Sequence, residues 1–207
     1  RSGDFDIRNI SAIVRNTGTT YRKTWSRPST STLLATLVDM SGSMSGKPLM
    51  TAMTGALALT EATRGTQVEN WIYGYTGYSP IVHLYEFADG QAAANLVQRR
   101  LDSYGRLGLG CTPTGEAMAA LGTRMDYDTH DRRILLVLTD GDADNMPLCK
   151  ATAEILQRRG VEVVAIGIRQ DSVKHWAPVS HVIQDISELP AALLATIDPR
   201  NAKRMAA

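Results

Sequence analysis

Three continuous apolar runs set the limits on what this chain can fold into. They are TLLATLVD (residues 32–39), RRILLVLTD (132–140) and VEVVAIGI (161–168). Strands buried on both faces of a parallel sheet have such runs, whereas strands with one solvent-exposed face alternate apolar and polar residues. Segments with helical spacing separate the three runs. The sequence therefore predicts an α/β fold: a doubly wound, mostly parallel central sheet with helices on both faces.

Two further segments predict an antiparallel edge to this sheet. VENWIYGY (68–75) and IVHLYEFA (81–88) are strand-like and flank the turn signal TGYSP. Because so short a connection joins antiparallel strands, we expect one antiparallel edge strand. A short strand near 181–183 would complete the sheet.

Helix signals occur between the strands. Pro48 suits the first turn of a helix, Thr114 and Ser187 are suitable N-caps, and Gly160 is suited to end a helix at its C-terminus. The helices that we expect are 6–16, one from Pro48 onward, 90–104, 114–125, 147–159 and 187–197.

The domain organisation that we expect is simple. Residues 1–29 form an N-terminal helix and lead-in segment packed on the domain, 30–197 form one α/β domain, and 198–207 form a flexible tail. Two cysteines, Cys111 and Cys149, are too few for a disulfide scaffold, which favours a cytoplasmic location.

The balance of positive and negative residues bears on which kinds of partner the chain could bind. The chain has 22 Lys and Arg against 21 Asp and Glu, a formal net charge of +1. This balance gives no support to nucleic-acid binding or to a polybasic membrane patch. No apolar run reaches the roughly 18 residues that span a bilayer. We therefore expect neither a nucleic-acid nor a membrane partner.

The loop after the first apolar run, in LVDMSGSMSGKP (37–48), invites comparison with a phosphate-binding loop. A Walker A motif has four residues between its glycines and a Ser or Thr after the Lys. Here three residues separate Gly42 from Gly46, and Pro48 follows Lys47. The hydroxyl that would bind Mg²⁺ is missing, so this loop is not a Walker A motif.

The same loop instead carries oxygen donors suited to a metal ion. Asp39, Ser41 and Ser43 form Asp-x-Ser-x-Ser, Thr112 lies in GLGCTPTGEAM, and Asp140 lies in LTDGDAD. Asp39 and Asp140 each end an apolar strand, and sites in such sheets form at the carboxyl ends of the strands. Carboxylates and hydroxyls are hard ligands for Mg²⁺, and also for Mn²⁺ or Ca²⁺.

These three motifs, in this order, resemble the von Willebrand factor A domain and its metal-ion-dependent adhesion site. The resemblance covers roughly residues 30–197. It implies that Ser41, Ser43 and Thr112 ligate the ion through their hydroxyls, and that Asp39 and Asp140 act directly or through water. It also implies an open coordination position for an Asp or Glu of a protein partner, with no reaction required.

The strand and loop sequences resemble one branch of that family most. LLATLVDMSGSMSGKPL, RRILLVLTDGDAD and GVEVVAIGI are similar to the cobaltochelatase subunit of cobalamin biosynthesis and to domains that work with MoxR-type AAA+ ATPases. The resemblance implies a non-enzymatic adaptor domain of an AAA+ assembly. An adhesion-type domain that binds an extracellular or surface ligand is the alternative.

An enzymatic alternative uses the segment ILLVLTDGDAD. It resembles the first motif of haloacid-dehalogenase-type phosphotransferases, with Asp140 as nucleophile and Asp142 as acid/base. Asp144 stands where that family has Thr or Val.

The same stretch does not match an EF-hand calcium-binding loop, because Asn145 and Ala151 replace the required Gly and Glu.

Overall fold

The computed structural model describes residues 4–5, 21–22, 31–90, 99–100, 103, 110–185, 188–189 and 191–192. Strand β1 (Asp4–Phe5) pairs antiparallel with β2 (Tyr21–Arg22). The helix expected over 6–16 and the tail over 198–207 lie outside the described residues, as do most of the helices expected over 90–104 and 187–197.

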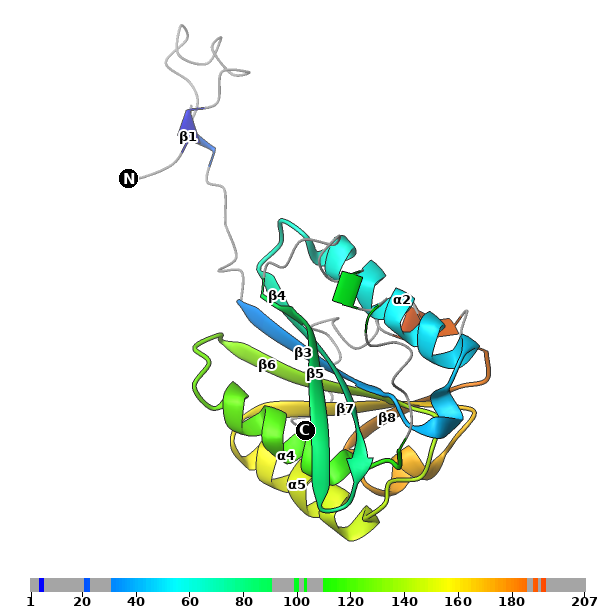
Figure 1. Cartoon of the computed structure of the whole chain (residues 1–207). Helices are drawn as coiled ribbons and strands as arrows, with labels where there is room; N and C mark the ends of the chain where they lie inside the picture. Colours follow the sequence, from blue (N-terminus) through cyan, green and yellow to red (C-terminus); the bar gives the residue numbers. More distant parts are fainter. Residues whose placement is uncertain are drawn as a thin grey trace, which may run out of the picture.

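A six-stranded sheet forms the centre of the domain (Figure 1), in the order β5-β4-β3-β6-β7-β8. All neighbours are parallel except β5, which pairs antiparallel with β4 at one edge. The predicted sheet is thus confirmed, and β4 and β8 extend beyond their predicted bounds. The strands are β3 (Thr32–Asp39), β4 (Val68–Tyr78), β5 (Ile81–Asp89), β6 (Arg132–Thr139), β7 (Val161–Ile168) and β8 (Val179–Ile183).

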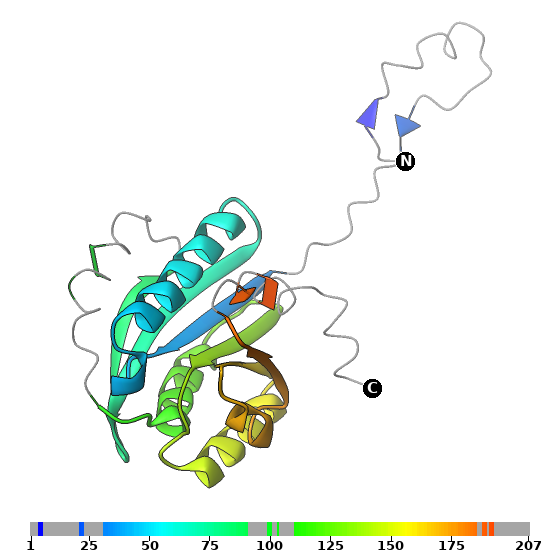
Figure 2. The same cartoon turned by 90° about the vertical axis from the view of Figure 1, so that its right-hand side faces the viewer.

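Helices cover both faces of this sheet, as Figure 2 shows. Helix α2 (Lys47–Thr63) lies on one face, and α4 (Thr114–Met125) and α5 (Met146–Arg158) lie together on the other. Each face has its own apolar cluster. No helix in the described part of the chain is long and apolar enough to cross a bilayer.

Strand β3 is buried along its whole length, which explains its continuous apolar run. Leu34 and Val38 pack in the cluster beneath α2, whereas Leu33 and Leu37 pack in the cluster beneath α4 and α5. Burying each such side chain contributes roughly 1.5–3 kcal/mol. The strand that carries Asp39 is therefore firmly anchored on both sides.

The helix ends follow their sequence signals only in part. Thr114 is not the N-cap of α4 but its first residue, because Pro113 occupies the cap position. The α5 cap is Asn145, whose side chain accepts a hydrogen bond from Leu148 N at 3.1 Å. Gly160 follows α5 with φ +79° and donates its N–H to Gln157 O at 2.9 Å, as predicted.

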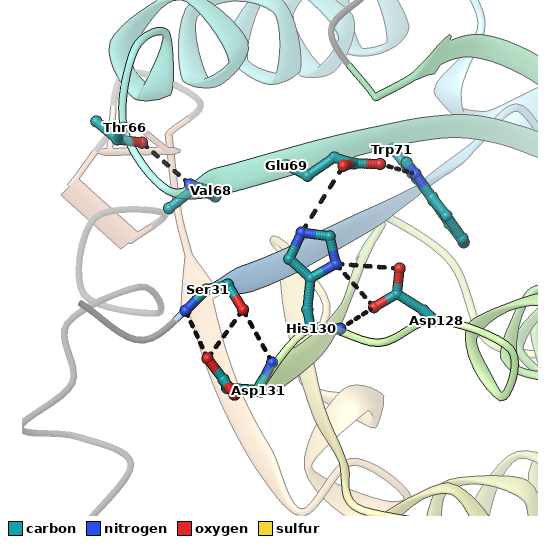
Figure 3. Close-up of polar contacts among 8 residues, drawn as sticks. All are labelled: Ser31, Thr66, Val68, Glu69, Trp71, Asp128, His130 and Asp131. Atoms are coloured by element: carbon teal, nitrogen blue, oxygen red, sulfur yellow. Dashed lines mark hydrogen bonds and ion pairs between the residues drawn. The ribbon is translucent and has the colours of Figure 1, made fainter. Parts of the chain in front are cut away.

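The amino ends of the parallel strands are held by polar contacts at the edge opposite the candidate site (Figure 3). Ser31 donates its N–H and its Oγ hydrogen to Asp131 Oδ2, at 3.0 and 2.9 Å. His130 Nδ1 lies 2.9 Å from Asp128 Oδ1, and its Nε2 lies 3.7 Å from Glu69 Oε2. His130 thus connects the segment before β6 to β4, which is a structural role.

Gly74 gives the residue after β3 room to lie in the core. Met40 is fully buried, and its N–H donates to Tyr75 O at 2.8 Å. A Cβ on Gly74 would overlap Met40 Sδ and lie 2.7 Å from Phe87 Cε2. The absence of a side chain at Gly74 therefore allows Met40 to pack in the core immediately after Asp39.

We predict that Gly74→Ala lowers the free energy of unfolding by about 1–3 kcal/mol, because the added methyl overpacks the core. Urea denaturation followed by circular dichroism measures this. Gly42→Ala is the control, since its Cβ would come no closer than 4.0 Å to Gly110 O. Equal stability of the Gly74→Ala variant and the wild type would show that Met40 has another place to pack.

Candidate metal centre

The candidate site lies at the carboxyl edge of the sheet, where three loops meet. One loop follows β3, one precedes α4 and one follows β6. From β3 the chain continues to β4 on one side of the sheet, and from the adjacent β6 it continues to β7 on the other side, so the strand order reverses between β3 and β6. Open α/β sheets bind ligands at such a switch point. The topology therefore brings the predicted donors to one edge.

Asp39 is the last residue of β3, and its side chain is fully buried. Its Oδ1 accepts the N–H of Ser41 at 2.8 Å, and its Oδ2 accepts the hydroxyl of Thr139 at 2.6 Å. Burial raises the pKa of this carboxyl from 3.8 to about 6, against the opposing effect of those hydrogen bonds. The two hydrogen bonds thus fix the direction of the carboxylate, and its burial removes it from solvating water.

Hydroxyls connect the β3 loop to the β6 loop. Ser41 Oγ lies 3.1 Å from Ser43 Oγ, and Ser43 Oγ donates to Asp140 Oδ1 at 2.7 Å. Ser41 is buried and Ser43 is exposed. Four of the five predicted donors therefore belong to one cluster, with Ser43 on its solvent side.

Thr112 is the fifth predicted donor, and an aspartate that the sequence did not single out for this role holds it in place. Asp144 Oδ1 accepts the N–H of Thr112 at 2.9 Å, and Asp144 N donates to Thr112 O at 3.0 Å. The other oxygen of Asp144 accepts the N–H of Ser79 at 3.4 Å. Asp144 is thus a positioning residue that joins the β6 loop to the α4 loop and to the β4–β5 turn.

Gly141 lies where the donors converge. A Cβ on Gly141 would lie 3.4 Å from Thr112 Oγ1, 3.6 Å from Ser43 Oγ and 4.0 Å from Asp39 Oδ2. Oxygens from two loops and from the end of β3 therefore surround one point, and the glycine leaves that point free of carbon. The structure thus brings all five predicted donors together.

A second threonine of the same loop, Thr114, makes a contact away from the convergence point. Thr114 Oγ1 lies 2.9 Å from the hydroxyl of the buried Tyr75. It thus fastens the start of α4 to β4. This contact leaves Thr112 as the threonine that faces the convergence point.

The donor set is rich in hydroxyls and poor in carboxylates. Within the described ranges there is no group of three or more His, Cys, Asp or Glu side chains that would hold a metal ion. A cation here would rest on two carboxylates and three neutral hydroxyls. All five are hard oxygen donors, which suits Mg²⁺, Mn²⁺ or Ca²⁺ better than a soft metal.

Residues 34–187 match the family model of the von Willebrand factor type A domain, and the chain belongs to this family. No curated protein sequence matches the chain. The resemblance seen in the sequence is thereby confirmed at the level of the domain family.

Solved structures share the fold at low sequence identity. The pilus adhesin SpaC from Lactobacillus rhamnosus GG is 15% identical, with a TM-score of 0.65 over 86% of this chain and 31% of its own. Proximal thread matrix protein 1 from mussel byssus, with a zinc-occupied MIDAS motif, is 16% identical, with a TM-score of 0.64 over 82% of this chain and 48% of its own. Manganese-loaded TRAP protein from Plasmodium vivax is 16% identical, with a TM-score of 0.61 over 83% of this chain and 73% of its own. The chain thus spans a third to a half of the first two proteins.

The raised pKa of Asp39 makes the metal-free protein less stable as the pH rises. The folded state retains its proton up to about pH 6, whereas the unfolded chain loses it near 3.8. In the presence of a chelator, the free energy of unfolding should therefore fall by about 2–3 kcal/mol between pH 4 and pH 7. Asp39→Asn should lack this part of the pH dependence.

Urea denaturation at several pH values in this range tests this prediction. Asp142→Asn, at an exposed position of the β6 loop, is the control and should keep the wild-type profile. Identical profiles for the wild type and Asp39→Asn would mean that Asp39 ionises without a burial penalty.

Proposed function

We propose that this domain binds one divalent cation through Asp39, Ser41, Ser43, Thr112 and Asp140, and that it uses the ion to dock a carboxylate of a protein partner. The observation that carries the proposal is the convergence of three oxygens on one point above Gly141. A turn whose polar side chains only capped its own backbone would not aim them at a shared point.

The donor types explain why such a site would bind a partner. Neutral hydroxyls leave much of the ion's charge uncompensated, so a bound divalent ion supplies an attraction for one more anionic oxygen. Asp39 remains held by Ser41 N and Thr139. A cation beside it would favour its ionised form and offset the burial that raises its pKa.

Mg²⁺ is the ion that we propose, with Mn²⁺ or Ca²⁺ as alternatives. Related domains of the same fold hold zinc in the mussel protein and manganese in the Plasmodium protein, which supports a divalent ion. An all-oxygen donor set without His or Cys favours Mg²⁺ or Mn²⁺ over zinc.

The partner that we propose is a MoxR-type AAA+ ATPase or its target, in a cytoplasmic assembly similar to the cobaltochelatase. The domain would act there as a non-enzymatic adaptor. The sequences of the loops after β3 and β6 resemble those of the cobaltochelatase subunit and of domains that work with MoxR-type ATPases, which supports this choice. The alternative, adhesion to a surface ligand, is supported by the similarity in fold to the pilus adhesin SpaC. The adaptor function and the adhesion function would both use the same metal centre.

We predict that Ser41→Ala/Ser43→Ala weakens Mn²⁺ binding by at least about tenfold, because two oxygen ligands are lost. Titration followed by the electron paramagnetic resonance signal of free Mn²⁺ measures this, with excess acetate present to supply the remaining carboxylate ligand. Competition by Mg²⁺ then gives the affinity for the ion that we propose.

Ser45→Ala is the matched control, because Ser45 is exposed in the same loop and, among the described residues, its side chain forms no hydrogen bond. It should bind Mn²⁺ like the wild type. Equal Mn²⁺ affinity of all three proteins would place the ion elsewhere and overturn the proposed site.

Gly141→Ala should also abolish Mn²⁺ binding while leaving the metal-free fold intact. Its methyl would make ordinary contacts of 3.4 Å or more, and Gly141 is not among the glycines with positive φ. Stability should therefore change by less than about 0.5 kcal/mol. Gly42→Ala, whose Cβ would come no closer than 4.0 Å to Gly110 O, should bind Mn²⁺ normally. Undiminished binding by Gly141→Ala would show that the ion does not occupy the convergence point.

A further inference from the structure

A cleft of about 340 Å³ opens at the same edge of the sheet, beside the candidate metal centre. It lies where the first turn of α2 faces the ends of β7 and β8. Its size is at the lower end for ligand pockets, which suits one or two side chains of a partner. The lining residues are Lys47, Pro48, Thr51, Asp140, Ile168, Arg169 and Asp185.

Arg169 is held rigidly at the mouth of this cleft. Its backbone has φ 58°, and it is the one non-glycine residue with positive φ in the described part of the chain. Its N–H donates to Ile183 O at 2.8 Å, and its Nε donates to Gln184 O at 3.0 Å. Both terminal NH₂ groups of its guanidinium remain without a partner among the described residues. Such a guanidinium is prepared for bidentate binding of a carboxylate.

Lys47 provides a second cation on the opposite wall. It is exposed, and its carbonyl oxygen accepts the hydroxyl of Thr51 at 2.8 Å. Its ammonium group forms no ion pair with any described residue. Pro48 and Ile168 add apolar surface to the lining of the cleft.

Two carboxylates also line this cleft. Asp140 Oδ1 accepts the hydroxyl of Ser43 at 2.7 Å, so that carboxylate faces the metal centre. Asp185 is the other carboxylate, and it has an interaction of its own. Two cations and two carboxylates line the cleft, so a divalent ion bound beside Asp140 would give the cleft and the ion together a net positive charge, which favours an anionic occupant.

We propose that this cleft binds a second acidic side chain of the partner segment whose first carboxylate completes the metal centre. The inference rests on the proposed function. Asp140 lines the cleft and also belongs to the metal centre, so the two sites adjoin. One short segment therefore reaches both, with its second carboxylate between Lys47 and Arg169. The partner's docking segment is thus an acidic peptide with two carboxylates at a fixed spacing.

Selection from a displayed peptide library tests this proposal. The peptides carry one fixed Asp flanked by random residues, and they are selected on the full chain loaded with Mn²⁺, with a chelator as the negative condition. The wild type is compared with Lys47→Gln, with Lys47→Gln/Arg169→Gln, and with Lys150→Gln/Arg158→Gln. The last variant is the matched control, because it removes two exposed charges from α5, on the other face of the sheet.

We expect the wild type and the control to enrich a second Asp or Glu at one spacing from the fixed Asp. The double variant at the cleft should keep the requirement for Mn²⁺ and lose that second preference. For the selected peptide, its affinity should fall roughly 5- to 20-fold, and Lys47→Gln should lie between. Changing the second acid of the peptide to its amide should weaken wild-type binding by a similar factor and hardly affect the double variant.

Two outcomes would contradict different parts of the proposal. If no acidic peptide is enriched in the presence of Mn²⁺, the proposed metal-dependent docking itself is wrong. If peptides with a single acid are enriched, or if the second preference survives in the double variant, the metal-dependent docking stands and the cleft proposal is overturned. Direct Mn²⁺ binding should be the same in all four proteins, because neither Lys47 nor Arg169 is a metal donor.

Discussion

The burial of the Asp39 carboxylate is the constraint on which the candidate site depends. A carboxylate at the end of a fully buried strand is short of solvation, although Ser41 N and Thr139 Oγ1 donate hydrogen bonds to it. Those bonds fix its direction but do not return its pKa to the ordinary value. A divalent cation would supply the missing stabilisation. The end of the central strand β3 thus carries a group that a bound cation would stabilise.

The surrounding loops are held around that carboxylate by their own hydrogen bonds. The Ser41–Ser43–Asp140 chain links two loops, and Asp144 fixes the position of Thr112 through backbone contacts in both directions. These contacts hold the donor side chains in place. Ion binding would therefore need little rearrangement of the loops.

The sequence predicted the sheet and the grouping of five oxygen-bearing side chains at one edge of it, because both leave local patterns. Buried strands appear as continuous apolar runs, and Asp-x-Ser-x-Ser after such a run marks a loop at the carboxyl edge. The roles of Gly141, Asp144 and Arg169 had no such pattern. Asp144 acts on Thr112, 32 positions away, and the left-handed backbone of Arg169 depends on contacts with the end of β8. Contacts of this kind are set by the packing of loops that lie far apart in the sequence. The N-cap of α4 at Pro113, in place of the expected Thr114, shows that tertiary packing can also shift the end of a helix.

A metal centre and a cationic cleft would perform different tasks in recognition. An ion that accepts one carboxylate provides affinity, but any exposed Asp or Glu would satisfy it, so it discriminates poorly between partners. A second carboxylate held by Arg169 and Lys47 adds a requirement for spacing and direction, which a single acid does not meet. Because the guanidinium of Arg169 is already anchored through Nε, little side-chain freedom is lost when it binds. Selectivity at this edge would therefore come from the cleft, while the strength and the metal dependence of binding come from the ion.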